Sequence, residues 1–514
     1  MSVINVTNLT FGYEGSVDNV FENVSFIIDT DWKLGFIGRN GRGKTTFLKL
    51  LQGEYEYQGS IQSTTVYDYF PYDISNEGKL KCGIDIFGER HPEGEDWKLF
   101  CELEKLKLNS EILYRPFNTL SHGEQTKVML AMLFSQDNYF LLIDEPTNHL
   151  DIYSRNIVKT YLKNKKGFIL ISHDRDLLDD CIDHILVINP NSVCVEKGNF
   201  SSWRENKEKK DAFELAENHK HMQEIGKLKV AAQRASAWAD KSENRKIGYD
   251  PIKENDRSIA TRSYMGAKTK KMESRRKNIE ERVDREIKQK ENLLKNIEVA
   301  VDLKLVPMDH FKEVYIEAKD FGISYVNNKK KNQIFNHIDF QLKRGERILL
   351  QGGNGSGKSS IIKAILEKNS EYRSNVVFMG KVEYSGSLEV VSGLKISYIN
   401  QDTSYLKGTL KDYIEKNELN ESLLKTILRQ LDLEAVQFGK YLEDYSQGQK
   451  KKLLIATSLM SQGHLYIWDE PLNYIDVFSR IQIENLILKY KPTMLIVEHD
   501  PVFGEKVATK IISL

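Results

Sequence analysis

Short runs of apolar residues that end at glycine or aspartate occur near both ends of this chain. The runs LGFIG and RILLQG end at Gly38 and Gly352, and each leads into a glycine-rich loop followed by a helical pattern. The runs FLLID and LYIWD end at Asp144 and Asp469. Apolar runs of four to eight residues bounded by turn residues are typical of buried strands. The pattern therefore predicts strands that feed loops and helices, and an α/β fold class.

The centre of the chain has a helical period instead. Residues 205–240 contain no proline, and residues 264–299 repeat the same kind of spacing. Apolar side chains recur there at three- and four-residue intervals, namely Met222, Ile225, Leu228, Ala232, Ala235 and Ala239, then Ile279, Val283, Ile287, Leu294 and Ile297. Two such limbs predict an antiparallel helical hairpin. At 1.5 Å per residue, a limb of about 36 residues would be roughly 54 Å long.

The segment 243–263, ENRKIGYDPIKENDRSIATRS, lies between the two helical limbs. It is too rich in Gly, Pro, Asn and Asp for a helix or a strand, so we predict that it forms the turn of the hairpin.

Four motifs occur twice in the same order. The first copies are GRNGRGKT, LSHGEQ, LLIDEPTNHLD and ILISHD at 38–45, 120–125, 141–151 and 169–174, and the second are GGNGSGKS, YSQGQK, YIWDEPLNYID and LIVEHD at 352–359, 445–450, 466–476 and 495–500. A repeat of this length is a duplicated domain rather than a solenoid. We therefore expect a first domain at 1–202, a linker at 203–305 and a second domain at 306–514.

The glycine-rich loops match the GxxxxGK[ST] pattern in its strand-loop-helix context. In such a P-loop, backbone N–H groups and the following helix N-terminus hold phosphate oxygens. The residues expected to bind ATP are Gly38, Asn40, Gly41, Gly43, Lys44, Thr45 and Thr46 in the first copy and Gly352, Asn354, Gly355, Gly357, Lys358, Ser359 and Ser360 in the second. Lys44 and Lys358 would reach the terminal phosphates. A glycine-rich turn is the alternative for a single match, but two matches in this context make it improbable.

Candidate metal-binding and catalytic residues lie at the ends of the predicted strands. Mg²⁺ would be shared by Thr45 with Asp144 and by Ser359 with Asp469. A glutamate follows each of these aspartates, and a histidine ends a later strand in each copy. Beside a metal, the glutamate can polarise an attacking water, and the histidine can hydrogen-bond the γ-phosphate. The candidate catalytic residues are Glu145, Glu470, His173 and His499.

Composition limits the alternatives. The 514 residues are 40% hydrophobic and 29% charged, with 74 basic and 74 acidic side chains. Positive charge is concentrated at 241–290, which hold 16 Lys/Arg against 9 Asp/Glu. The four cysteines have no metal-like spacing, and we expect them to be reduced thiols in a cytosolic protein. No apolar stretch of about 18 residues is present, so we expect no membrane segment.

The motifs LSHGE and YSQGQ resemble the signature of ATP-binding-cassette ATPases, over residues 1–200 and 313–514. In that family two cassettes pack head to tail, and each ATP lies between the P-loop of one and the signature of the other. The resemblance implies a monomer with an internal pseudo-dimer, in which Ser446 and Gly448 complete the first site and Ser121 and Gly123 complete the second. Tyr13 and Tyr325 match the aromatic residue that stacks on adenine, although either could be a strand-edge tyrosine.

Several positions depart from the family pattern. Tyr72 stands where the second copy keeps Gln401, which the resemblance assigns to ATP and metal binding. His122 replaces the usual glycine of the signature, and Leu472 stands where the first copy has Thr147. The differences predict two unequal ATP sites.

Two fused cassettes with a long charged linker resemble the ABC-F subfamily, whose members act on ribosomes. The segments PFNTLSHGEQTK, DAFELAEN and YIWDEPLNYIDVF resemble the Lsa and CplR type of antibiotic-resistance factors. The implied partners are the 70S ribosome, 23S rRNA and P-site tRNA, without a separate transmembrane subunit. The linker would enter from the tRNA exit site and displace lincosamides, pleuromutilins and streptogramin A with a tip that includes Arg245, Lys246, Tyr249, Arg257 and Arg262.

The linker and the function each leave an alternative open. The basic residues Lys268, Lys270, Lys271, Arg275, Arg276 and Lys277 would neutralise rRNA phosphates, or would form a solvated coiled-coil surface. The chain could instead be a housekeeping translation factor that acts on peptidyl-tRNA, or the ATPase subunit of an exporter.

Overall fold

The protein is described by a computed structural model. It covers residues 2–14, 19–92, 94–136, 139–148, 150–189, 192–247, 270–271, 274, 277, 281–283, 285–286, 303–327, 330–373, 378 and 381–514. The chain divides into two compact units, one made of Met1–Trp203 with Ala300–Leu514 and the other of Arg204–Val299. The first unit contains both copies of the repeated motifs, called here the first copy (up to Trp203) and the second copy (from Leu303).

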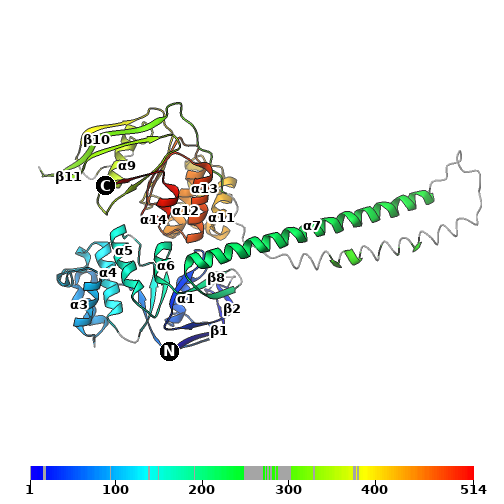
Figure 1. The fold of residues 1–514 in the computed structure, drawn as a ribbon, viewed down its shortest axis with the longest axis horizontal. Coiled ribbons are helices and arrows are strands. Elements are labelled where there is room, and N and C mark those ends of the chain that lie inside the picture. Colours follow the sequence, from blue (N-terminus) through cyan, green and yellow to red (C-terminus); the bar gives the residue numbers. More distant parts are fainter. Residues whose placement is uncertain are drawn as a thin grey trace, which may run out of the picture. The chain divides into compact units, whose positions relative to one another are not determined.

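Each copy is built on a mainly parallel sheet (Figure 1). In the first copy the strand order is β5(Val66–Phe70), β6(Tyr139–Asp144), β7(Phe168–Ile171), β3(Lys33–Ile37), β8(His184–Asn189) and β9(Ser192–Lys197), with only β9 antiparallel. In the second copy the order is β14(Ile396–Ile399), β15(Leu465–Asp469), β16(Met494–Val497), β12(Arg347–Gln351) and β17(Lys510–Ser513), all parallel. Their central strands are almost wholly buried, as expected for sheets covered on both faces. The predicted α/β class is confirmed.

A smaller antiparallel sheet accompanies each parallel one. It consists of β2(Phe21–Asp29), β1(Val3–Phe11) and β4(Gln58–Gln62) in the first copy and of β11(Lys330–Lys343), β10(Val314–Asn327) and β13(Lys381–Val390) in the second. Apolar side chains of the small and large sheets share one core in each copy, together with those of the helix that follows the P-loop. The strand before each P-loop and the helix after it are therefore both anchored in this core.

Helices complete the two copies. They are α1(Lys44–Leu51), α2(Gly83–Arg90), α3(Asp96–Lys105), α4(His122–Phe134), α5(Ile152–Lys163) and α6(Arg175–Cys181), then α9(Lys358–Lys368), α10(Leu410–Lys416), α11(Glu421–Gln430), α12(Gln447–Met460), α13(Val477–Tyr490) and α14(Pro501–Val507). Polar residues of the repeated motifs cap several of them. Asp151 and Asp476, for example, accept backbone N–H bonds at the starts of α5 and α13.

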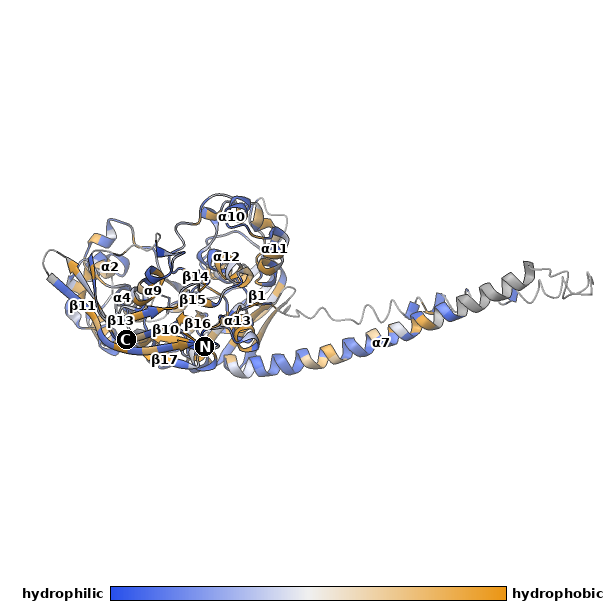
Figure 2. Cartoon of the chain, turned by 90° about the horizontal axis from the view of Figure 1, so that it is seen from above, coloured by the Kyte–Doolittle hydropathy of each residue, from blue (hydrophilic) through white to orange (hydrophobic). Residues whose placement is uncertain are grey.

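The second unit contains most of one long helix, α7(Phe200–Ile247). In Figure 2 most of the coloured part of α7 is hydrophilic. Ile225 and Val283, one from each predicted limb, are both buried. The described residues between 270 and 286 are helical, in agreement with the prediction of a second limb.

Two expectations for the linker are wrong. Residues 243–247 belong to α7 and not to a turn, because their local sequence has no glycine or proline before Gly248. Met222 is 62% exposed rather than part of the buried stripe.

Candidate functional site

The first P-loop holds its lysine inside the loop. Gly43 precedes α1 with a φ of 85°, a conformation that favours glycine. Lys44 is buried, and its Nζ donates to the carbonyl oxygens of Gly38 and Arg39 at 2.7 and 3.1 Å. Burial lowers the pKa of this ammonium group. Phosphate oxygens can take the place of these carbonyls, which is the exchange that a P-loop lysine makes on binding a nucleotide.

The second P-loop has the same construction. Gly357 has a φ of 101°, and Lys358 Nζ donates to the carbonyls of Gly352 and Gly353 at 2.9 and 2.8 Å. Burial also lowers the pKa of Lys358. The equivalence of the two loops thus extends from sequence to atomic contacts.

A hydroxyl and a carboxylate meet beside each P-loop. Thr45 Oγ1 donates to Asp144 Oδ2 at 2.8 Å, and Ser359 Oγ donates to Asp469 Oδ2 at 3.0 Å. The Oδ1 atom of Asp469 is buried and has no hydrogen-bond partner within the described part of the chain. Burial raises the pKa of Asp469 to about 6. Hard oxygen donors of this kind suit Mg²⁺, so both pairs fit the expected metal.

The first candidate catalytic glutamate contacts the strand-end histidine. Glu145 Oε1 lies 3.3 Å from His173 Nε2, and Glu145 Oε2 accepts the His173 backbone N–H at 3.3 Å. Burial and the adjacent charge of Asp144 raise the pKa of Glu145 to about 8. Burial lowers the pKa of His173 well below its ordinary value.

The second glutamate has more donors. Glu470 Oε1 lies 3.5 Å from His499 Nε2, while Oε2 accepts from Gln401 Nε2 at 2.8 Å and from Asn473 Nδ2 at 2.7 Å. Burial alone would raise the pKa of Glu470, but the hydrogen bonds and positive charge around it lower the pKa instead. The two carboxylates are therefore chemically unequal, as the sequence differences predict.

One cavity of about 600 Å³ brings together most residues predicted for the first site. A volume of this size suits a nucleotide. Its predicted lining residues are Tyr13, Asn40, Gly41, Gly43, Lys44, Thr45, Thr46, Asp144, Glu145, His173, Ser446 and Gly448. The first P-loop and the second signature thus share one cavity.

The cavity also contains residues that sequence reasoning missed. Asp432, Glu434 and Gln437 line it from the segment between α11 and α12. Asp432 forms an ion pair with Arg39 of the first P-loop. No repeated motif marks this segment, so no signal in the sequence distinguishes it from an ordinary loop.

The signature serines begin helices. Ser446 and Ser121 form capping boxes with the residues three positions later, Gln449 and Glu124. Gly448 allows a close approach, because a Cβ there would meet the carbonyl oxygen of Tyr474 at 2.6 Å. Backbone N–H groups at a helix start can bind phosphate.

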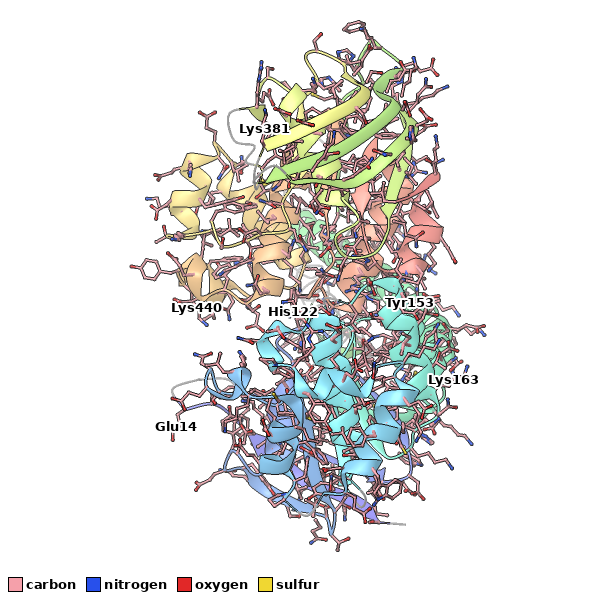
Figure 3. All side chains as sticks on the ribbon, turned by 90° about the vertical axis from the view of Figure 1, so that its left-hand side faces the viewer. Glu14, His122, Tyr153, Lys163, Lys381 and Lys440 are labelled. Carbon is pink, nitrogen blue, oxygen red and sulfur yellow. The ribbon has the colours of Figure 1, made fainter. Side chains whose placement is uncertain are left out.

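Ser121 and Gly123 of the first signature contact residues of their own copy. Ser121 bonds to Glu124, and Gly123 lies against Leu150 and Ser154. His122 is exposed at the start of α4 (Figure 3). At the second P-loop, the backbone N–H of Asn354 donates to Asp151 of the first copy.

The two candidate adenine-stacking tyrosines occupy matching places. Tyr13 is hydrogen-bonded to Thr46 at 2.7 Å, and Tyr325 to Ser360 at 3.0 Å. Tyr13 is 44% exposed and lines the cavity of the first site.

Tyr72 does not occupy the place of a site glutamine. It is 9% exposed and packs into the helical core of the first copy, with its hydroxyl 2.9 Å from Met132 Sδ and the Arg90 guanidinium 3.9 Å from its ring. The aromatic ring gains more from burial than from a polar cavity. Tyr72 is therefore not among the residues that line the cavity of the first site, and its effect on that site stays a prediction.

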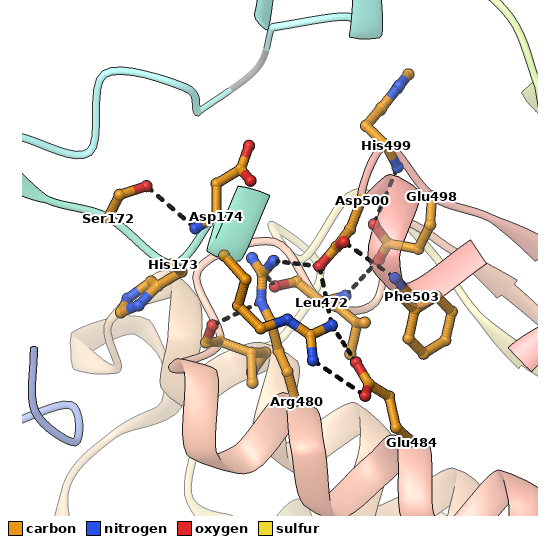
Figure 4. A network of polar contacts seen from close by, with 12 residues as sticks. Ser172, His173, Asp174, Leu472, Arg480, Glu484, Glu498, His499, Asp500 and Phe503 are labelled. Carbon is orange, nitrogen blue, oxygen red and sulfur yellow. Dashed lines mark hydrogen bonds and ion pairs between the residues drawn. The ribbon is translucent and has the colours of Figure 1, made fainter. Parts of the chain in front are cut away.

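Buried ion pairs join the two copies (Figure 4). Arg175 of α6 donates to Glu484 of α13, with Nη1 3.1 Å from Oε2, and its Nη2 lies 3.5 Å from Asp500 Oδ2. Arg480 Nη1 donates to the same Asp500 oxygen at 3.3 Å. Pro501 stands where the first copy has Arg175, so this contact has no equivalent on the other side.

Some of the predicted tip residues belong to α7, and the others follow it in the sequence. The backbones of Arg245 and Lys246 are helical, and their side chains lie outside the described residues. Tyr249, Arg257 and Arg262 lie wholly outside them.

Comparison with known families agrees with this geometry. A family model described as ABC transporter matches residues 21–148 and 335–473, more than half of the chain. The chain belongs to this family. It is an ATPase, and the two copies are ABC cassettes, which bind ATP. In the described part of the chain, no helix combines the length and apolar character needed to span a membrane.

Several relatives match along nearly the whole chain. The ribosome protection protein VmlR of Bacillus subtilis (strain 168) is 26% identical over 98% of this chain and 85% of its own length. The ATP-binding protein Uup of Buchnera aphidicola subsp. Acyrthosiphon pisum (strain APS) is 28% identical over 99% and 80%. ABC transporter F family member 2 of Arabidopsis thaliana is 23% identical over 100% and 76%. The relatives thus include ABC-F proteins.

Solved structures share the fold. The archaeal ribosome recycling factor aABCE1, in complex with the stalk protein aP1, has a TM-score of 0.60 at 17% identity and covers 98% of this chain and 87% of its own. A structure described as RNase-L Inhibitor has a TM-score of 0.58, also at 17% identity, over 99% and 87%. These similarities establish the tandem-cassette fold.

Proposed function

We propose that this ATPase is an ABC-F ribosome-protection factor of the Lsa and CplR type. It binds the ribosome at the tRNA exit site, contacts 23S rRNA and P-site tRNA, and displaces lincosamides, pleuromutilins and streptogramin A from the peptidyl-transferase centre. The observation that carries the proposal is the match to a protein named for ribosome protection over 98% of the chain, linker included.

The architecture of the linker supports this proposal. A helix of 48 residues rises about 1.5 Å per residue, so α7 is roughly 70 Å long. Among its exposed side chains, Phe213, Lys220, Lys227 and Arg234 recur every seven residues, which places them along one face. The three cations on this face, Lys220, Lys227 and Arg234, suit a polyanionic partner such as rRNA.

ATP binding and hydrolysis at the two sites would control how the factor binds to the ribosome. With ATP held between the cassettes, Lys44 and Lys358 would contact phosphates. Thr45 with Asp144, and Ser359 with Asp469, would hold Mg²⁺, which would supply positive charge to neutralise the phosphates. Glu145 and Glu470 orient water, and hydrolysis then releases the factor. The Gln401 and Asn473 donors keep Glu470 ionised as a base, so the second site would hydrolyse faster.

A housekeeping translation factor that acts on peptidyl-tRNA is the competing function, because a relative of comparable similarity, Uup, is named for ATP binding and not for ribosome protection. Two measurements separate the candidates. The chain with non-hydrolysable ATP should co-sediment with 70S ribosomes, whereas an exporter subunit should not. Expression in a susceptible host should raise the minimum inhibitory concentrations of the three drug classes, whereas a housekeeping factor leaves them unchanged.

The linker segment offers a sharper test. Replacing residues 248–262 by a Gly/Ser sequence of equal length leaves α7 and both cassettes intact. We expect resistance to disappear while ATPase activity and ribosome binding persist, since loop exchange at constant length changes closure entropy little. The matched control is a variant in which the native residues of 248–262 are kept but their order is scrambled, so that the length and the net charge of the segment stay the same. Full resistance in the Gly/Ser variant would refute a role for this segment in drug displacement.

A further inference from the structure

Tyr69 of β5 reaches the aspartate beside the first P-loop. Its hydroxyl donates to Asp144 Oδ2 at 3.2 Å, the same oxygen that accepts the Thr45 hydroxyl at 2.8 Å. None of the repeated motifs includes this tyrosine. Two hydroxyl donors on one oxygen fix the rotation of the carboxylate group.

The register of the parallel sheet explains the contact. Tyr69 pairs with Leu142, and Phe70 pairs with Ile143, the residue before Asp144. Side chains alternate between the two faces of a sheet, so Tyr69 and Asp144 lie on the same face, two residues apart in register. A tyrosine is long enough to bridge that offset.

The second cassette places an equivalent tyrosine differently. Tyr398 pairs with Ile467 and so has the same register relative to Asp469. Its hydroxyl instead donates to Asn400 Oδ1 at 3.3 Å. The first cassette has Pro71 at the position of Asn400, and proline offers no side-chain acceptor. The tyrosine of the first cassette is therefore left to bond with the aspartate.

We propose that Tyr69 is a positioning residue of the first ATP site, orienting the Asp144 carboxylate for the metal in the cassette that lacks a counterpart of Gln401. The proposal rests on the proposed role of Asp144 as a metal ligand. Gln401 acts on the neighbouring glutamate in the second site, so the two cassettes organise their carboxylates through different side chains.

The chemistry of tyrosine suits this task. The phenolic hydroxyl of a tyrosine is protonated at neutral pH, so it can donate a hydrogen bond to the carboxylate. A donor to Oδ2 leaves the other lone pairs of the carboxylate for a cation or its water ligands. Groups that orient a metal ligand in this way strongly influence metal affinity.

The test measures Mn²⁺ binding to the full chain with a non-hydrolysable ATP analogue, by electron paramagnetic resonance of the free ion. Tyr69→Phe is made in a Lys358→Ala background, which leaves the first site as the nucleotide site. Tyr398→Phe in a Lys44→Ala background is the matched control. Asp144→Asn in the first background tests the metal ligand itself, and binding of a fluorescent ATP analogue in EDTA reports on folding.

We expect Tyr69→Phe to weaken Mn²⁺ binding about tenfold while metal-free nucleotide binding changes less than about twofold. Tyr398→Phe should leave Mn²⁺ binding unchanged. Unchanged Mn²⁺ affinity in Tyr69→Phe, with a loss in Asp144→Asn, would overturn the role of Tyr69 alone. Unchanged affinity in both would overturn the assignment of Asp144 as well. An equal loss in Tyr398→Phe would show a general effect of strand tyrosines and would also overturn the proposal.

Discussion

Replacing Arg175 by methionine should loosen the junction between the two cassettes. The Arg175 and Glu484 side chains are each only 3% exposed, and Asp500 beside them is 1% exposed. Burial alone would lower the pKa of Arg175, but its bonds to Glu484 and Asp500 raise it above the ordinary value. The Arg175 guanidinium is therefore a charged partner of two buried carboxylates.

The size of the effect follows from that burial. Removing one member of a buried ion pair leaves an uncompensated charge and costs about 3–5 kcal/mol. For domains the size of one cassette, each kcal/mol shifts the melting temperature by roughly 2–4 °C, so we expect a decrease of about 10 °C. Lys506, 3.8 Å from Glu484, is about half exposed and compensates for only part of the loss.

Scanning calorimetry of the full chain measures this decrease. Lys163→Ala is a suitable control, because Lys163 pairs with Asp180 at 3.2 Å on the surface of α5 (Figure 3), with exposed fractions of 57% and 39%. Such a pair contributes about 0–1 kcal/mol. The double variant Arg175→Met with Glu484→Leu should recover much of the loss, because apolar replacement of a whole buried pair is often neutral. The reasoning is refuted if Arg175→Met melts no lower than Lys163→Ala.

Three further outcomes are expected for the ATP sites. Glu145→Gln combined with Glu470→Gln should reduce phosphate release at least about 100-fold while ATP binding is retained, and turnover near the wild-type rate would exclude these residues as bases. Of the two single variants, Glu470→Gln should reduce turnover more, because Gln401 and Asn473 orient this carboxylate; equal losses would contradict the inequality of the sites. Arg39→Ala removes the ion pair with Asp432 and should weaken ATP binding at the first site several-fold. Titration of a fluorescent ATP analogue in a Lys358→Ala background measures this loss. Lys440→Ala, which changes an exposed side chain, should leave the titration unchanged.

The sequence by itself determined the parts of this protein that depend on local pattern. Glycines at fixed spacing predict loops with positive φ, and Gly43 and Gly357 adopt it. Apolar runs that end in aspartate predict buried strands with their acids at one edge, and β6 and β15 have this form. The helical period of the linker predicts α7, although its end lies beyond the expected limb. Each of these features follows from interactions between residues close in the chain.

Tertiary packing alone decided which side chains meet. Tyr69 bonds to Asp144 across 75 positions, and Arg175 meets Glu484 across 309. Tyr72 turned into an apolar core, where its ring is buried, and away from the site that its alignment with Gln401 suggests. Side-chain direction in these places depends on strand register and on contacts between cassettes. Those contacts arise from segments far apart in sequence, whose spacing carries no periodic signal.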